Sequence, residues 1–282
     1  MGRILDGKEV ARAVKDEVAA AVAGLDYQPG LATVLVGEDP ASQSYVRGKR
    51  RDAEQVGIRS FHHEPWADVS QVDLVALVED LNQDEGVDGI LVQLPLPGHL
   101  DGEATVEVID PAKDVDGLHP FNLGRLVLGK PGLRPSTPTG VMRILDHYGI
   151  VTVGARAVIV GRSFLVGRPL AMILSERGVD STVSVAHSRT QDLASVTREA
   201  DILIAAAGSP GLIGPDHVQP GATVIDVGVN RTNDGLVGDV DFDSVVDIAG
   251  AITPVPGGVG PMTRAMLLVN TLSAARARRA VN

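Results

Sequence analysis

The sequence predicts an α/β fold in which mainly parallel β-strands alternate with α-helices. Along its 282 residues, short β-branched, apolar runs alternate with longer segments of helical periodicity, a pattern typical of crossover units. Many of the 32 glycines and 17 prolines lie at the ends of these runs, where turns are expected. Aromatic residues make up only 3% of the chain, so the core has to be built mainly from Val, Leu, Ile and Ala.

The first third of the chain predicts three helices and three strands. Asp39-Pro40 places a capping residue and a first-turn proline at the start of one helix, which we expect to end at Gly57. Ser70 can cap another helix. The expected helices cover residues 8–24, 40–56 and 70–83, and the expected strands cover residues 31–37, 58–64 and 87–97.

The middle of the chain, residues 110–138, is rich in Gly, Pro and Asp and has no clear period. It is either a linker or an ordered functional loop. A second α/β series follows and ends in a long helix. Its expected helices cover residues 139–150, 166–177, 191–199 and 260–280, and its expected strands cover residues 155–161, 181–187, 201–208, 222–228 and 247–253.

The composition excludes several classes of protein. The formal net charge of −11 argues against a general nucleic-acid-binding protein, which needs a basic field. The chain has no cysteine, which excludes disulfides and thiolate chemistry. The seven histidines are scattered without metal-binding spacing, so we expect no metal site. No apolar run is long enough to span a membrane, and the start of the chain lacks an apolar signal core, so we expect a cytoplasmic protein.

The segment "QSYVRGKRR", residues 43–51, places an aromatic ring and an amine on one helix face. Tyr45 and Lys49 are four residues apart, about one helical turn, so both side chains leave the helix on the same side. One interpretation is a solvated basic face, since three arginines lie in the same segment. The other is a ring platform and a proton-handling amine that face one pocket.

Three further stretches carry residues that could contact a ligand. Gln93 follows the apolar run in "GILVQLPLP", and a buried amide there either satisfies backbone groups or orients a ligand or another side chain. Asp114 and Asp116 in "KDVDG" are explained by a turn, and they offer too few oxygens for a calcium loop. Residues 252–263, "ITPVPGGVGPMT", hold more glycine than a tight turn needs, which would let backbone approach a ligand closely.

The segment "VIVGRSFLVGRPLA", residues 158–171, predicts a strand, a glycine-bearing turn and a helix. Such a turn holds dinucleotide phosphate at the helix N-terminus. The glycine spacing departs from G-x-G-x-x-G, so a plain βα turn is the alternative. NAD-binding units usually carry a carboxylate at the end of the next strand, where this chain has "HSR", residues 187–189. Together with Arg162, this end forms a cationic, hydroxyl-lined site that suits the 2′-phosphate of NADP.

Nine stretches, in order between about residues 4 and 272, together resemble the bifunctional methylenetetrahydrofolate dehydrogenase/cyclohydrolase family. They are "SQSYVRGKRRDAEQVGI", "GILVQLPLP", "PAKDVDGLHPFNLGRL", "PSTPTG", "VIVGRSFLVGRPLA", "TVSVAHSRT", "VIDVGVN", "GDVDF" and "TPVPGGVGPMTRAMLLVNT". Two departures are visible: Ser136 stands where the family often has Cys, and Arg51 stands where a second Lys is common. They put in doubt thiol sensitivity and the surface charge near the site entrance.

The resemblance implies two αβα domains with a substrate cleft between them. Residues 1–138 would form a folate-binding catalytic domain, to which a helix at residues 261–282 returns. Residues 139–260 would form a Rossmann-like NADP-binding domain. The implied activity is NADP-dependent oxidation of 5,10-methylenetetrahydrofolate, followed by hydrolysis of the methenyl product to 10-formyltetrahydrofolate. The family also implies a homodimer.

The resemblance implies roles residue by residue. In similar proteins the tyrosine packs against the folate ring and the lysine is the central catalytic residue, which assigns these roles to Tyr45 and Lys49. Gln93 would orient Lys49, and Asp116 would anchor the amino edge of the pterin. The other implied folate contacts are Val92, Leu94, Pro256, Gly257 and Gly258, and the implied NADP contacts are Gly161, Arg162, Ser163, Ser188 and Val229.

Two other interpretations remain open from the sequence. Another two-domain NADP oxidoreductase, such as a shikimate-dehydrogenase-like protein, would share the fold but would leave the Tyr45/Lys49 pair and the loop at residues 252–263 unexplained. A nucleotide-sensing module that has lost its chemistry would share the cofactor site. The presence of Lys49, Gln93 and Asp116 argues against such a module.

Overall fold

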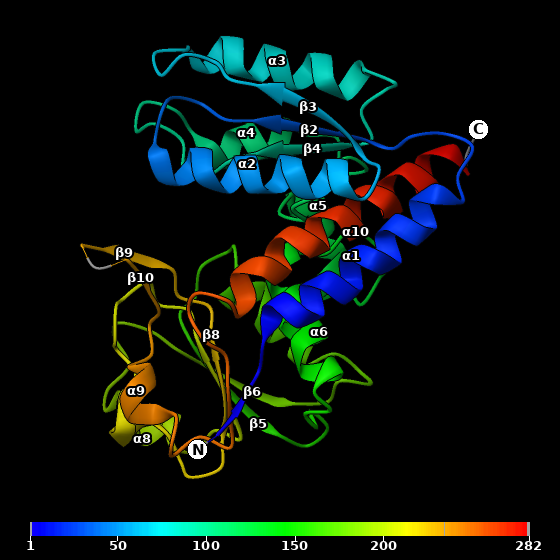
Figure 1. Ribbon diagram of the computed structural model, residues 1–282. Coiled ribbons are helices and arrows are strands. Elements are labelled where there is room, and N and C mark those ends of the chain that lie inside the picture. The colour runs from blue at the N-terminus through cyan, green and yellow to red at the C-terminus, as the bar shows by residue number, and fades with distance from the viewer. Residues whose placement is uncertain (1, 234, 281–282) are drawn as a thin grey trace. The chain divides into compact units, whose positions relative to one another are not determined.

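The computed structural model of the protein describes residues 2–233 and 235–280, which divide into two compact units (Figure 1). The first comprises Arg12–Ser136 and the chain from Arg264 onward, and we call it the three-stranded unit. The second comprises the chain up to Ala11 and Thr137–Thr263, and we call it the six-stranded unit. The unit boundaries fall inside three helices: α1 (Gly7–Ala23), α10 (Val259–Arg279) and, at its first residue, α6 (Ser136–His147).

The three-stranded unit is built on a parallel sheet in the order β3-β2-β4. Its strands are β2 (Gly30–Val34), β3 (Arg59–His63) and β4 (Gly89–Val92). Every residue of β2 and β4 is buried. Strands covered on both faces carry continuous apolar runs rather than alternating ones, which is the pattern that predicts them in the sequence.

Helices cover both faces of this sheet (Figure 1). Leu31 of β2 packs in a core with α1, α2 (Pro40–Gln55) and α10. Its neighbour Ala32 packs in a second core with α3 (Gln71–Gln83) and α4 (Gly102–Val108). Successive side chains of a strand point to opposite faces, so β2 joins the two cores.

Capping side chains fix the starts of two helices where the sequence predicts them. The Asp39 carboxylate accepts a hydrogen bond from the Ser42 amide at 2.7 Å, and Pro40 occupies the first turn of α2. The Ser70 hydroxyl accepts one from the Asp73 amide at 3.1 Å at the start of α3. Each cap satisfies a backbone N–H that has no partner within the helix.

Two short helices lie where the sequence analysis predicts none. α4 follows Asp101, whose carboxylate accepts a hydrogen bond from the Ala104 amide at 3.0 Å. α5 (Pro120–Val127) follows His119, whose Nδ1 accepts one from the Phe121 amide at 3.0 Å. Helices of seven and eight residues are too short to show a clear period. The middle of the chain is therefore ordered, with α5 inside it, and its functional role stays a prediction.

The six-stranded unit contains a parallel sheet in the order β1-β11-β8-β7-β5-β6. Its strands are β1 (Arg3–Ile4), β5 (Arg156–Val160), β6 (Thr182–Ala186), β7 (Ile202–Ala205), β8 (Thr223–Asp226) and β11 (Ala251–Ile252). The sequence analysis does not predict β1, because two residues carry no pattern. Pairing of β1 with β11 joins the start of the chain to this unit.

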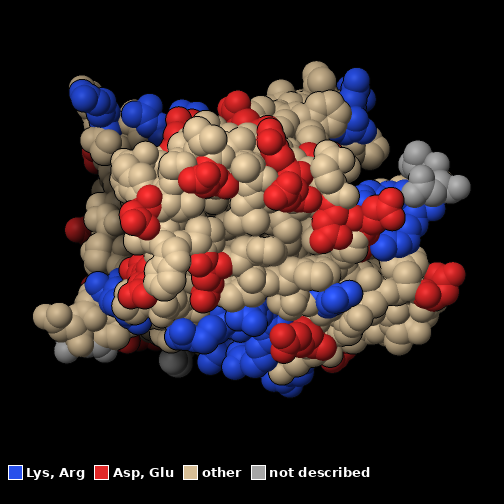
Figure 2. Space-filling view, turned by 90° about the horizontal axis from the view of Figure 1, so that it is seen from above, with Lys and Arg blue, Asp and Glu red and all other residues tan. Residues whose placement is uncertain are grey.

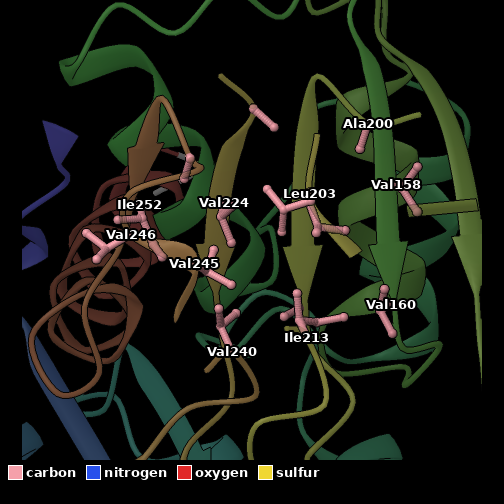
Figure 3. Close-up of a cluster of buried hydrophobic side chains, with 14 of the residues drawn as sticks. Val158, Val160, Ala200, Leu203, Ile213, Val224, Val240, Val245, Val246 and Ile252 are labelled. Atoms are coloured by element: carbon pink, nitrogen blue, oxygen red, sulfur yellow. The ribbon is translucent and has the colours of Figure 1, made fainter. Parts of the chain in front are cut away.

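The same unit carries shorter helices and a small hairpin around its sheet. They are α6 (Ser136–His147), α7 (Gly167–Leu174), α8 (Leu193–Thr197), α9 (Phe242–Val245), the 3-10 helix Pro215–His217, and the antiparallel strands β9 (Asn230–Thr232) and β10 (Gly235–Val237). Figure 3 shows apolar side chains of four sheet strands pointing into one core. Val158, Leu203, Val224 and Ile252 are each at most 3% exposed, so this core is built from aliphatic residues as the composition predicts.

The surface carries both signs of charge. On the face shown in Figure 2, acidic groups are spread among neutral residues and basic groups lie mostly around the rim, with the largest patch along the lower edge. This distribution fits the net charge of −11. Within residues 2–233 and 235–280, we find no helix with the length and apolar character that crossing a bilayer requires.

Candidate active site

Helix α2 and the end of β4 bring together the residues that the sequence analysis singles out in the three-stranded unit. The Lys49 side chain lies inside the unit, with only 3% of the residue exposed. Its Nζ donates a hydrogen bond to Gln93 Oε1 at 3.0 Å and lies 4.8 Å from the centroid of the Tyr45 ring. The interpretation of this helix face as a solvated basic surface is therefore wrong for Lys49.

The amide of Gln93 is held in one orientation. Its Nε2 donates to the Leu94 carbonyl at 2.6 Å, and its backbone N–H donates to the Val34 carbonyl at 2.9 Å. The side-chain oxygen is consequently left to face Lys49. Val92, which is 3% exposed, anchors the preceding strand in the core. Both roles considered for Gln93 are present, since it satisfies backbone and orients another side chain.

Asp116 lies in a turn that Asp114 organises. Asp114 Oδ1 accepts a hydrogen bond from the Gly117 amide at 3.1 Å, and Oδ2 accepts bonds from the His119 amide at 2.8 Å and Asn122 Nδ2 at 2.9 Å. Gly117 has φ +72°, a conformation that suits glycine. The turn explains Asp114 fully, while Asp116 remains half-buried and acts electrostatically on Lys49.

Burial and nearby charges act in opposite directions on the lysine and the carboxylate. Burial lowers the pKa of the Lys49 amine below its ordinary value of 10.5, an effect that the Asp116 carboxylate opposes and the Arg264 guanidinium reinforces. Burial raises the pKa of the Asp116 carboxyl above its ordinary value of 3.8, while Lys49 opposes this shift. Groups whose pKa values are shifted toward each other in this way are suited to exchanging protons.

In the six-stranded unit, the strand order reverses at β5, with β6 on one side and β7 on the other. In open parallel sheets, ligands bind outside the carboxyl ends of the strands at such a reversal. Gly161, directly after β5, has φ +128°, and a Cβ there would lie 2.0 Å from the Ala206 carbonyl oxygen. A Cβ at Gly167 would lie 2.1 Å from the Gly161 carbonyl oxygen. Both glycines are therefore required by close backbone packing, which accounts for their unusual spacing.

The residues predicted to contact the cofactor all follow carboxyl ends of this sheet. Gly161, Arg162 and Ser163 follow β5, Ser188 follows β6 and Val229 follows β8. All except the half-buried Gly161 are exposed. At the start of α7, the Val166 amide donates to Ser163 Oγ at 3.2 Å and the Arg168 amide donates to the Ser163 carbonyl at 3.1 Å. Two hydroxyls and the Arg162 guanidinium beside a helix start form a donor set that fits a phosphorylated dinucleotide.

Two buried carboxylates, to which the sequence analysis gives no role, hold the loops at this sheet edge. Asp239 accepts hydrogen bonds from the amides of three consecutive residues, 207–209, at 2.6, 2.8 and 2.9 Å. Asp226 accepts bonds from the amides of Gly228, Asp239 and Val240 at 2.9, 3.0 and 2.9 Å. Burial raises the pKa of Asp226 to about 6 against these bonds. The sequence carries one signal for these residues: Asp226 is an aspartate at the end of an apolar strand.

The predicted folate loop belongs to the six-stranded unit, where Pro256 is exposed and Gly257 and Gly258 are buried. Gly257 has φ +118°. A Cβ at Gly7 would lie 1.8 Å from the Gly258 carbonyl oxygen, so this loop packs against the start of α1. Its contact with folate stays a prediction. In the described part of the chain, no three His, Asp or Glu side chains are grouped so that they could hold a metal ion.

Two family models match most of the chain. The catalytic domain of tetrahydrofolate dehydrogenase/cyclohydrolase matches residues 5–116, and its NAD(P)-binding domain matches residues 135–279. The chain belongs to the tetrahydrofolate dehydrogenase/cyclohydrolase family. This confirms the resemblance and the two-domain α/β fold with a Rossmann-like second domain. Membership in the tetrahydrofolate dehydrogenase/cyclohydrolase family also removes the interpretation as a shikimate-dehydrogenase-like enzyme.

Individual members of the tetrahydrofolate dehydrogenase/cyclohydrolase family are similar over the whole length. Bifunctional protein FolD of Acidiphilium cryptum (strain JF-5) is 58% identical, over 98% of this chain and 99% of that protein. The crystal structure of FolD from Campylobacter jejuni superposes with a TM-score of 0.95 at 46% identity, covering 99% and 100% of the two chains. FolD of Trypanosoma brucei, solved with NADP cofactor and an inhibitor, gives 0.93 at 41% identity, covering 100% and 99%.

Proposed function

We propose that this protein oxidises 5,10-methylenetetrahydrofolate with NADP⁺ and then hydrolyses the methenyl product to 10-formyltetrahydrofolate. The observation that carries the proposal is the buried Lys49 amine, bonded to Gln93 and set beside the Tyr45 ring. These residues lie within the segment that matches the family's catalytic domain. The full-length similarity to proteins named bifunctional FolD supports the same pair of activities.

The first step is a hydride transfer from the methylene carbon of the substrate, which becomes a methenyl cation. Bound NADP⁺ supplies the hydride acceptor for this step. The chain contributes orientation, because transfer requires the carbon to face the acceptor closely. We assign the flat surface under the folate ring to Tyr45 and the anchor for the amino edge of the pterin to Asp116. The other folate contacts that we propose are Val92, Leu94, Pro256, Gly257 and Gly258.

The second step adds water to the methenyl carbon. The water oxygen bonds to this carbon and loses a proton. One of the two C–N bonds then breaks as its nitrogen takes up a proton, and the oxygen loses its second proton as the formyl C=O forms. The Lys49 amine, with its pKa lowered by burial, can accept and return such protons. Gln93 holds the amine in place through its side-chain oxygen. Asp116 is the negative charge that acts on the amine.

We propose that Arg162, Ser163 and Ser188 hold the 2′-phosphate side of NADP, with Gly161 and Val229 as backbone and apolar contacts. A hydrogen bond to a charged group contributes about 1.5–3 kcal/mol, which corresponds to a preference for NADP⁺ of about tenfold to a hundredfold. Arg162→Ala should therefore raise the Michaelis constant for NADP⁺ and leave that for NAD⁺ nearly unchanged. Equal losses with both cofactors would reject this assignment of Arg162.

The activity itself is tested by absorbance of the methenyl form with purified protein, 5,10-methylenetetrahydrofolate and NADP⁺. Transient appearance of the methenyl band with reduction of NADP⁺, followed by its decay, supports both activities. Binding of NADP without any turnover would instead support the nucleotide-sensing module. Reduction of NADP⁺ by another substrate class, with no reaction of the folate, would also reject the proposal.

We further propose that folate is bound mainly by residues 1–138 with the C-terminal helix and NADP by residues 139–260, in a cytoplasmic homodimer. One feature that supports self-association is β6, an edge strand of the six-stranded sheet in the described part of the chain. Its Val185 side chain is 40% exposed, and open strand edges can pair with a second copy. Light scattering on the eluting protein measures the assembly directly.

A further inference from the structure

A buried carboxylate lies one helical turn beyond Lys49 on α2. Asp52 is 2% exposed, and its two oxygens pair with cations from two other helices. Lys15 Nζ of α1 lies 3.3 Å from Oδ1, and Arg264 Nε of α10 lies 3.1 Å from Oδ2. Neither cation belongs to the residues that the sequence predicts for the site. Because a buried charge has to be paired, Asp52 fixes where these two helices place their cations.

Arg264 reaches α2 at the residue next to Lys49. A Cβ at Gly48 would lie 2.4 Å from Arg264 Nη1 and 3.4 Å from its Cδ. Glycine is unfavourable inside a helix, but here it leaves the space that the guanidinium occupies. The guanidinium is thus held on one side by Asp52 and on the other by the bare backbone of Gly48.

The charged and titratable groups that face Lys49 come from three elements. Tyr45 lies on α2 itself, Asp116 lies in the loop before α5, and Arg264 lies on α10. Asp116 stabilises the ammonium form of the amine, whereas Arg264 disfavours it. Behind Arg264, the single negative charge of Asp52 faces two positive charges. This group therefore keeps a net positive charge, and proton acceptance by Lys49 requires the uncharged amine.

We infer that Arg264 is a positioning residue for the proton chemistry of Lys49: seated between Asp52 and Gly48, its guanidinium holds a fixed positive charge against α2 at the residue next to Lys49. The inference rests on the proposed function, because it concerns the group that handles protons during water addition. Asp52 then holds Arg264 through their ion pair, and Gly48, which has no side chain, leaves room for the guanidinium.

The test is the pH dependence of methenyltetrahydrofolate hydrolysis by purified full-length variants, corrected for the uncatalysed reaction. In Arg264→Met, which keeps an unbranched side chain but no charge, the limb where the rate rises with pH should move upward by about one pH unit. At a pH on the acidic side of this rise, the variant should hydrolyse the substrate about tenfold more slowly than the wild type. The expected direction follows from the sign: without the guanidinium, the ammonium form is favoured and persists to higher pH.

Two variants separate charge from structure. Arg264→Lys keeps a positive charge and should restore most of the wild-type profile. Arg276→Met removes an exposed arginine from the same helix and should leave the profile unchanged. Thermal unfolding of each variant controls for folding, since a merely structural role would change the midpoint temperature without moving the pH limb.

Three results would overturn the inference. An unmoved limb in Arg264→Met would leave Arg264 a structural residue only. A raised Michaelis constant for the folate with an unmoved limb would make it an anion contact of the substrate. Equal profiles for the Met and Lys variants would show that its charge is not the cause. Failure of the proposed function is distinct, because wild-type protein would then hydrolyse no methenyltetrahydrofolate at all.

Discussion

Lys49 and Lys113 are both buried in the three-stranded unit, with 3% and 1% of each residue exposed, but their surroundings differ. Lys113 Nζ donates to the backbone carbonyls of three residues at the end of α3, at 3.0, 2.7 and 2.8 Å. Those residues are Leu81, Asn82 and Asp84. Lys49 Nζ instead donates to a side-chain oxygen, that of Gln93, and faces Asp116 and Arg264.

The comparison separates a structural buried lysine from one suited to chemistry. Three acceptors use every proton of the Lys113 ammonium group and satisfy carbonyls at a helix C-terminus, where positive charge is favourable. Burial lowers the pKa of both lysines, that of Lys113 to about 8. A lowered pKa therefore does not distinguish the two lysines, whereas the kind of partner does. Lys49 lies among side chains that can hold, release and exchange a proton.

The largest effect should come from Lys49→Met. Methionine keeps an unbranched stem and is well tolerated in helices, so the fold and NADP binding should persist. Loss of a positioned acid–base group should lower the rate of methenyltetrahydrofolate hydrolysis by about 10²- to 10⁴-fold. Hydrolysis at the wild-type rate would show that the buried amine is not the catalytic residue.

Lys113→Met should have the opposite effects to Lys49→Met: it should lower stability and leave the rate of hydrolysis nearly unchanged. It leaves three carbonyls at the end of α3 without their donor, and loss of bonds to a charged group costs about 1.5–3 kcal/mol each before the chain relaxes. We expect the midpoint of thermal unfolding to fall by roughly 5–10 °C. The variant that stays folded should hydrolyse the substrate at nearly the wild-type rate. A large loss of turnover in folded protein would contradict the structural role.

A third variant uses the fact that the acceptor for Lys49 is a side chain. Gln93→Met removes the oxygen that holds the amine but keeps the backbone bond from residue 93 to Val34. The rate of hydrolysis should fall about tenfold to a hundredfold, as expected for one bond to a charged group. Stopped-flow absorbance of the methenyl band measures this rate. An unchanged rate would mean that Gln93 does not position Lys49.

The smallest effect is the pH dependence of stability that Lys113 contributes. Its pKa of about 8 in the folded protein lies below the ordinary 10.5, so above pH 8 the folded state releases a proton that the unfolded state keeps. The unfolded state then binds more protons, and stability rises with pH between about 8 and 10.5. The destabilising effect of burying the charge is complete below pH 8 and is relieved above it. Comparing urea midpoints of wild type and Lys113→Met across this range isolates the effect, and parallel curves would contradict it.

Much of the fold follows from local signals. Asp39 and Ser70 cap the helices that the sequence predicts, because a cap acts within three residues of itself. The βα turn after β5 is also local, and its departure from the usual glycine spacing is explained by backbone contacts at Gly161 and Gly167. The elements that were missed are too short to show a period: β1, the short helices α4, α5 and α9, the 3-10 helix Pro215–His217 and the hairpin strands β9 and β10.

The candidate site could be predicted only in part from the sequence. Spacing on one helix places Tyr45 and Lys49 together, but Lys49 and Gln93 are 44 residues apart and meet only through the fold. The role of Arg264 depends on the pairing of α10 with Asp52 on α2, which no local pattern encodes. The resemblance to a family supplied the residues that we propose to react, whereas the structure supplies the charges that surround them.

The most direct measurement of the central claim is the titration of each lysine amine by NMR. The chain has five lysines, at positions 8, 15, 49, 113 and 130, so ¹³C-labelled lysine gives a small set of signals that single substitutions assign. We predict that the Lys49 signal, identified by its loss in Lys49→Met, titrates clearly below 10.5 and moves upward in Arg264→Met. A Lys49 signal that titrates at or above 10.5 would contradict the account, because the amine would then stay charged at the pH where water addition occurs.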